Sequence, residues 1–205
     1  MTFLKLWMKT FIGFTLMAAL FACAEGPSSE NLNDMSLGSP EAPYELIEYA
    51  SATCPACAAL HSETWETVKT LTDDGKLHYI FREFPRNEID VAAFVLARCA
   101  GNTRYFAVLD DLFKNQTGIL NATRNGSVRS ALQTLAARHG VDGTQFETCL
   151  RDETLQADVT KASEAGRAAG VNATPTLFLN NRLLSGAEGR TAESLLTLIE
   201  GNPEG

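Results

Sequence analysis

Two closely spaced cysteines are the residues of this chain best suited to do chemistry. Cysteines occupy positions 23, 54, 57, 99 and 149, and only Cys54 and Cys57 are separated by just two residues. Such a pair can form a reversible disulfide because its sulfurs approach without movement of the backbone. It can also bind zinc or copper, but zinc sites usually add a second cysteine or histidine pair. Here only His61 lies close enough to add a third ligand, so the spacing favours redox chemistry.

A strand and a helix are predicted on either side of this pair. Residues 44–49 (YELIEY) have the pattern of a buried strand, and apolar residues then recur every three or four positions until the Asp-Asp-Gly at 73–75. Residues 77–84 (LHYIFREF) alternate as a second strand that ends before Pro85. A strand, helix and strand in this order imply parallel pairing of the two strands. Cys54 then lies where the first strand leads into the helix.

This position suits a nucleophilic sulfur. The free N–H groups and the positive end of the helix dipole favour a thiolate at Cys54. Pro55 fits the first helical position, where no hydrogen bond is lost. We expect Cys54 to be the exposed nucleophile that forms a mixed disulfide and Cys57 to be the resolving thiol, one turn deeper.

The rest of the chain is predicted to be mainly helical until residue 170. No convincing strand occurs in residues 87–170, where helices fit at about 88–100, 103–115, 127–139, 145–151 and 153–169. Residues 176–180 (TLFLN) and 182–185 (RLLS) then predict a hairpin, and Thr191 begins a last helix that ends at Gly201. The predicted fold is α/β, with an inserted helical block between a β-α-β unit and a β-β-α unit.

The first 24 residues have the pattern of a signal peptide. Lys5 and Lys9 precede an apolar run at 11–22 that is too short for a comfortable membrane span, although a retained anchor is the alternative. The small residues at 22–24 offer a cleavage site, and residues 20–23 (LFAC) also resemble the lipobox of bacterial lipoproteins. Cys23 is then either removed or lipidated. Residues 25–38 are polar and are expected to be a flexible linker.

The charge of the chain argues against a nucleic-acid partner. It has 17 basic and 25 acidic residues, which gives a formal net charge of −8. Phosphate binding needs clustered Lys and Arg, and no basic run follows the first ten residues.

Two segments together resemble one known family. Residues 48–57 (EYASATCPAC) and the following AALH are similar to the active-site segment of DsbA-like thiol:disulfide oxidoreductases, which have the thioredoxin fold. Residues 170–176 (GVNATPT) resemble the family's second signature, a loop with a Thr–cis-Pro bond. The resemblance divides the chain into residues 39–86 and 171–203, the two parts of the thioredoxin fold, and an inserted helical subdomain at 87–170.

The resemblance implies roles for three further residues. The Thr174–Pro175 bond is expected to be cis and to lie beside Cys54, where backbone groups pair with a substrate chain. The alternative is an ordinary trans proline before a strand. Glu48 matches the family's buried acid, which implies a raised pKa and a proton relay to Cys57. A strand carboxylate that faces outward is the alternative.

A second disulfide, between Cys99 and Cys149, resembles one found in a largely alphaproteobacterial branch of the family. In an oxidising compartment this bond would close a long loop and stabilise the fold by about 4 kcal/mol. Neither cysteine follows a strand at the start of a helix, so its expected role is structural. Two buried free thiols are the alternative.

The function that the resemblance implies is oxidation of dithiols in exported proteins in the periplasm, without a cofactor. A quinone-linked, DsbB-like membrane partner would restore the disulfide of a monomeric enzyme, and an apolar surface around Cys54 and Pro175 would meet unfolded substrates. Strongly oxidising members carry His where this chain has Ala56, so a less oxidising potential is expected. A reductase or isomerase is the alternative, followed by a copper chaperone that uses Cys54, Cys57 and His61.

Overall fold

A five-stranded sheet forms the centre of the computed structural model, which describes residues 32–201. The strands lie in the order β1-β3-β2-β4-β5, and only β2 and β3 pair in parallel. Their bounds are β1 Met35–Leu37, β2 Tyr44–Ala50, β3 Leu77–Glu83, β4 Thr176–Leu179 and β5 Arg182–Leu183. The predicted β-α-β unit and terminal hairpin are therefore confirmed.

Eight helices accompany this sheet in the described part of the chain. Helix α1 connects β2 to β3, α2 to α7 form the insertion, and α8 follows the hairpin. The bounds are α1 Pro55–Asp73, α2 Glu88–Cys99, α3 Tyr105–Lys114, α4 Gln116–Arg124, α5 Val128–Arg138, α6 Gly143–Leu150, α7 Glu153–Ala168 and α8 Ala192–Glu200. No helix within residues 32–201 has the length and apolar character needed to cross a membrane.

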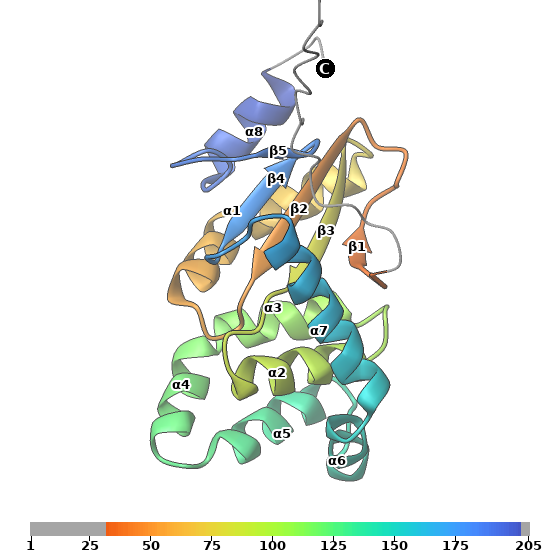
Figure 1. Cartoon of the computed structure of the whole chain (residues 1–205), viewed down its shortest axis with the longest axis vertical. Coiled ribbons are helices and arrows are strands. Elements are labelled where there is room, and N and C mark those ends of the chain that lie inside the picture. Colours follow the sequence, from red (N-terminus) through yellow and green to blue (C-terminus); the bar gives the residue numbers. More distant parts are fainter. Residues whose placement is uncertain (1–31, 202–205) are drawn as a thin grey trace, which may run out of the picture.

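The insertion lies at one end of the sheet, where β2 leads into α1. In Figure 1 helices α2 to α6 gather below the sheet, and α7 runs back along it to β4. Contacts between α1 and α3 and between α7 and β3 join the two parts. Aromatic side chains fill this junction, and Phe81 of β3 packs against Phe94, Tyr105 and Phe113 of the insertion. The site at the start of α1 is therefore enclosed by both parts of the fold.

The first strand corrects the predicted linker. Residues 25–38 were expected to be flexible throughout, but Met35–Leu37 pairs antiparallel with β3. Met35 is buried, and the adjacent Asp34 accepts hydrogen bonds from the buried Arg82. Three residues are too few to show an alternating pattern, and their partners are distant in the sequence. The expected signal peptide at 1–24 and Cys23 lie outside the described residues.

Helix α4 was also missed by the sequence analysis. It contains Gly118, two threonines and an asparagine, all of which form helices poorly. It buries only Gln116, Ile119 and Ala122. Its stability therefore comes from packing on the rest of the insertion, which a local pattern does not reveal.

Candidate active site

Cys54 is the N-cap residue of α1, and Pro55 is its first helical residue. The backbone N–H groups of Cys57 and Ala58 both donate to the Cys54 carbonyl, at 3.0 and 3.2 Å. Cys57 therefore lies in the first turn, and both cysteines are free thiols in this structure. The structure thus places the cysteine pair where it was predicted, at the start of the helix that follows the first strand of the β-α-β unit.

The two sulfurs are more enclosed than expected. Cys54 is only 4% exposed, whereas the sequence analysis expected an exposed nucleophile, and Cys57 is 0% exposed. The loop at 173–175 lies against Cys54. The Sγ of Cys54 donates a hydrogen bond to the Thr174 carbonyl at 3.4 Å. This loop is 120 residues away in the sequence, so the local pattern around Cys54 does not predict that the loop covers its sulfur. Cys54 is still the more accessible residue of the two.

The acidities of the two thiols are shifted in opposite directions. Burial raises the pKa of Cys54, but hydrogen bonds from Thr174 and from the backbone N–H groups of Cys57 and Ala56 outweigh it, so the pKa falls below its usual value of 9.0. Burial dominates at Cys57, and the nearby charges of Glu48 and Cys54 add to it, so its pKa rises well above 9.0. Of the two sulfurs, Cys54 is therefore the one that ionises more readily, and Cys57 holds its proton more tightly.

The loop that faces Cys54 contains a cis peptide bond between Thr174 and Pro175. The Thr174 hydroxyl is buried and has no hydrogen-bond partner within the described residues, so it is available to donate to a thiolate. It lies close enough to both sulfurs to lower the pKa of each thiol. Arg190 supports the loop from behind, because its guanidinium donates to the Pro175 carbonyl at 3.2 Å.

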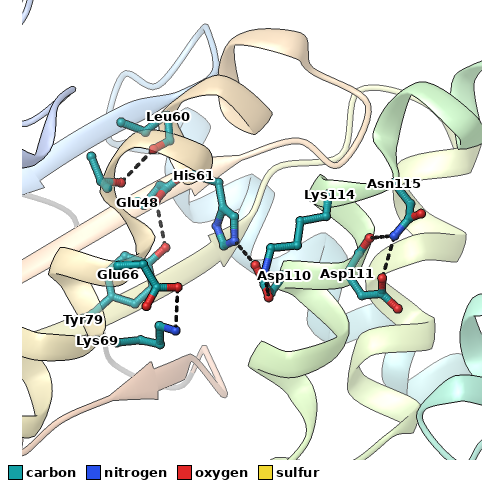
Figure 2. Close-up of polar contacts among 11 residues, drawn as sticks. Glu48, Leu60, His61, Glu66, Lys69, Tyr79, Asp110, Asp111, Lys114 and Asn115 are labelled. Carbon is teal, nitrogen blue, oxygen red and sulfur yellow. Dashed lines mark hydrogen bonds and ion pairs between the residues drawn. The ribbon is translucent and has the colours of Figure 1, made fainter.

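Glu48 lies on β2 and is 5% exposed, so the alternative of an outward-facing strand carboxylate does not hold. Its Oε2 accepts a hydrogen bond from the Tyr79 hydroxyl at 2.8 Å, as Figure 2 shows, and its Oε1 has no partner in residues 32–201. Burial raises the pKa of Glu48 from 4.5 to about 7, although Tyr79 and the positive charge of Arg190 partly oppose this rise. The carboxyl can therefore gain and lose a proton near neutral pH.

His61 is buried in the contact between α1 and α3. Its ring stacks between Trp65 and Phe113, and its Nε2 lies 2.9 Å from Asp110 of α3, which also binds Lys114 (Figure 2). Within residues 32–201, no three His, Cys, Asp or Glu side chains are grouped so that they could hold a metal ion. The third ligand that a copper site would need is therefore a packed side chain in the α1–α3 contact.

Two side chains of the insertion that the sequence analysis did not identify hold the loop before Cys54. Asp90 of α2 accepts hydrogen bonds from the Ser51 hydroxyl and the Thr53 N–H, and Gln116 of α4 donates to the carbonyls of Ala52 and Cys54. Both side chains are buried. A buried Asp or Gln within a helical stretch gives no signal in one sequence, because its partners are backbone groups far along the chain.

The remaining two cysteines are joined to each other. Cys99, the last residue of α2, and Cys149 of α6 form a disulfide with a Cα–Cα distance of 5.9 Å. The bond links two helices of the insertion whose positions in the chain differ by 50 residues. It takes no part in the hydrogen bonds around Cys54.

Comparisons with known proteins agree with this geometry. Residues 30–201 match the family model described as thioredoxin. A Rickettsia bellii protein named for protein-disulfide oxidoreductase activity is 32% identical over 153 residues, which cover 72% of this chain and 57% of that protein. This chain thus spans about half the length of the curated relatives that it matches.

Solved structures show the same fold. The crystal structure of alpha-DsbA1 from Wolbachia pipientis has a TM-score of 0.74 at 27% identity and covers 82% of this chain and 90% of its own. A protein-disulfide isomerase from Novosphingobium aromaticivorans shares the fold with a TM-score of 0.71 at 22% identity, over 88% and 100% of the two chains. The cysteine pair on α1, the facing cis-proline loop and these matches together show that the chain belongs to the thioredoxin family and has the fold of its DsbA-like members.

Proposed function

We propose that this protein is a periplasmic thiol:disulfide oxidoreductase that introduces disulfides into exported proteins through a mixed disulfide at Cys54. The observation that carries the proposal is the opposite acidity of two adjacent thiols: the pKa of Cys54 is lowered by hydrogen bonds and that of Cys57 is raised by burial. A sulfur that is stable as a thiolate is a good leaving group, and a deeper sulfur held as a thiol does not attack the mixed disulfide until it loses its proton, which leaves time for the second substrate thiolate to attack.

The reaction begins with a Cys54–Cys57 disulfide. A substrate thiolate attacks Cys54 Sγ, which forms the mixed disulfide and breaks the bond to Cys57, and Cys57 leaves as a thiolate. A second substrate thiolate then attacks the substrate sulfur of the mixed disulfide and releases the Cys54 thiolate. The substrate dithiol loses two electrons to become a disulfide, and the enzyme disulfide is reduced to the pair of thiols seen in this structure.

Glu48 is proposed to supply the proton that the Cys57 thiolate takes up. The Cys57 thiolate is a strong base in its buried position, and the carboxyl of Glu48 has a pKa of about 7, so a proton passes readily from the carboxyl to the sulfur. The influence of the Glu48 charge on the pKa of Cys57 supports their proximity. In the reverse reaction Glu48 would take the proton back.

Substrate binding is proposed to use the backbone of the loop at 173–175. The small apolar residues Pro55 and Ala56 beside Cys54 are exposed, whereas the exposed large hydrophobic side chains of the described residues are Leu183 on β5 and Leu196 on α8. Ala173 is exposed and Thr174 is half-buried, so the part of the loop before the cis bond reaches the protein surface. Pairing through backbone groups tolerates many sequences, which suits unfolded substrates.

Oxidation is the favoured direction, and reduction or isomerisation is the alternative. Stabilising the Cys54 thiolate stabilises the reduced form, which makes the disulfide more oxidising, but Ala56 has no side-chain donor to add to this effect. A quinone-linked, DsbB-like membrane partner would reoxidise the pair of a monomeric enzyme. No cofactor is part of the proposed reaction.

Equilibration of the Cys54–Cys57 pair with glutathione redox buffers tests this function. A potential clearly above that of glutaredoxins, about −200 to −230 mV, is expected, with DsbA at about −120 mV as the upper reference. A potential near that of thioredoxin, about −270 mV, would assign the protein to the reductases. Failure of the pair to exchange with glutathione at all would contradict both directions.

A further inference from the structure

The loop before Cys54 is held from two sides by the helical insertion. The peptide group between Ala52 and Thr53 has both of its polar atoms bound by insertion side chains: its carbonyl accepts from Gln116 Nε2 at 2.8 Å, and its N–H donates to Asp90 Oδ1 at 2.7 Å. The same Gln116 amide also donates to the Cys54 carbonyl at 2.9 Å. The insertion therefore fixes the orientation of the chain immediately before and at the proposed nucleophile.

The contact with the Cys54 carbonyl bears directly on the first turn of α1. That carbonyl already accepts from the N–H groups of Cys57 and Ala58, and Gln116 adds a third donor. The N–H groups of Ala56 and Cys57 in turn help to lower the pKa of Cys54. A loop that can rotate would move the sulfur away from these N–H groups, because they stabilise the thiolate only at hydrogen-bond distance.

The two side chains that make these contacts are buried, so their hydrogen bonds cannot be replaced by water. Gln116 is 6% exposed and Asp90 is fully buried, so each must satisfy its polar atoms within the protein. Asp90 also accepts from the Ser51 hydroxyl and from the Arg86 N–H, both at 2.8 Å, and thus ties the loop to the start of α2. The Gln116 amide is the one side chain of α4 that reaches this loop through a hydrogen bond in the described structure.

We propose that Gln116 is a positioning residue through which the helical insertion holds Cys54 in its reactive orientation. The proposal rests on the proposed function, since it assigns a role to the insertion in the reactivity of the same sulfur. Gln116 does not touch the substrate in this account. It acts through the two carbonyls that it binds, with Asp90 holding the opposite side of the loop.

The test compares two glutamine variants by the rate at which iodoacetamide alkylates Cys54 in the reduced protein, followed against pH by peptide mass spectrometry. Gln116→Met keeps the length of the side chain and removes its donor. Gln156→Met is the matched control, because Gln156 also donates to a backbone carbonyl of the insertion, that of Leu150 at 2.7 Å. Thermal unfolding of each variant is recorded in parallel.

Gln116→Met is expected to shift the alkylation profile of Cys54 to higher pH and to slow alkylation by about fivefold at slightly acidic pH, the size expected if the Cys54 thiolate loses one hydrogen bond from the N–H groups of α1. Gln156→Met should leave the profile unchanged at a similar loss of thermal stability. An unchanged profile in Gln116→Met, with only a lower unfolding temperature, would overturn the proposal and leave Gln116 a purely structural residue.

A second variant covers the case in which Gln116→Met does not fold. Gln116→Asn keeps the amide but shortens its reach by one methylene, and it should shift the profile in the same direction by a smaller amount. An unchanged profile there would also overturn the proposal. The proposed function fails separately, if Cys54 of the wild-type protein shows the profile of an ordinary thiol and exchanges with no disulfide.

Discussion

Glu48→Gln separates the charge of the buried carboxyl from its shape. Gln has nearly the same volume, and its carbonyl oxygen can accept the hydrogen bond that Tyr79 donates to Glu48 Oε2 at 2.8 Å. What the variant loses is the ability to ionise. The other buried oxygen, Oε1, has no partner in the described residues, so its replacement by an amide costs a similar amount at every pH.

The size of the effect follows from the pKa of Glu48, which burial raises from 4.5 to about 7. One pKa unit corresponds to about 1.4 kcal/mol, so ionising this carboxyl costs about 3 kcal/mol more in the folded protein than in the unfolded chain. Because the folded pKa is the higher one, the folded state binds more protons between the two values. The contribution of Glu48 to the free energy of unfolding is therefore fully present below about pH 4.5 and is lost as the pH rises through about 7.

Denaturant unfolding of the reduced wild-type and Glu48→Gln proteins measures this loss between about pH 4 and pH 8. The cysteines titrate in both proteins, so the difference between the two free energies of unfolding isolates Glu48. We expect that difference to move in favour of the variant by about 3 kcal/mol across the range. A difference that does not depend on pH would refute the buried, proton-exchanging carboxyl, and with it the proposed proton donor to Cys57.

Two further substitutions test the loop and the second disulfide. Thr174→Val removes the buried hydroxyl that lowers the pKa of Cys54, so the thiolate absorbance of Cys54 should appear at higher pH; an unchanged titration would contradict the role of this hydroxyl. Replacing both Cys99 and Cys149 by Ala opens a loop of 50 residues and should lower the free energy of unfolding by about 4 kcal/mol, with thiol exchange at Cys54 unchanged. A loss in the free energy of unfolding well below about 1 kcal/mol, or slower thiol exchange at Cys54, would contradict a purely structural role of this disulfide.

The sequence predicts most of the scaffold because its elements have strong local patterns. The last five residues of β2 are apolar or aromatic except for Glu48, and α1 repeats its buried residues every three or four positions around Trp65 and Val68. The cysteine pair and the proline at 175 are recognisable by residue type and order alone. These are the features that determine fold class and the candidate nucleophile.

The features that escaped prediction depend on contacts between distant segments. The strand Met35–Leu37 is identified by its pairing with β3, and the enclosure of Cys54 comes from a loop 120 residues away. Gln116 gives no signal because its partners are two backbone carbonyls, and every residue has one. Local periodicity contains no information on such pairings, which only the folded arrangement supplies.

The central claim is that Cys54 is the sulfur through which substrates exchange. It is tested most directly in a Cys57→Ser variant, where residue 57 can no longer resolve the mixed disulfide, so that this intermediate accumulates. After mixing with an unfolded, cysteine-containing protein in disulfide-bonded form, peptide mass spectrometry should find the substrate linked to Cys54. The absence of a covalent complex, or a link to a different cysteine, would contradict the account.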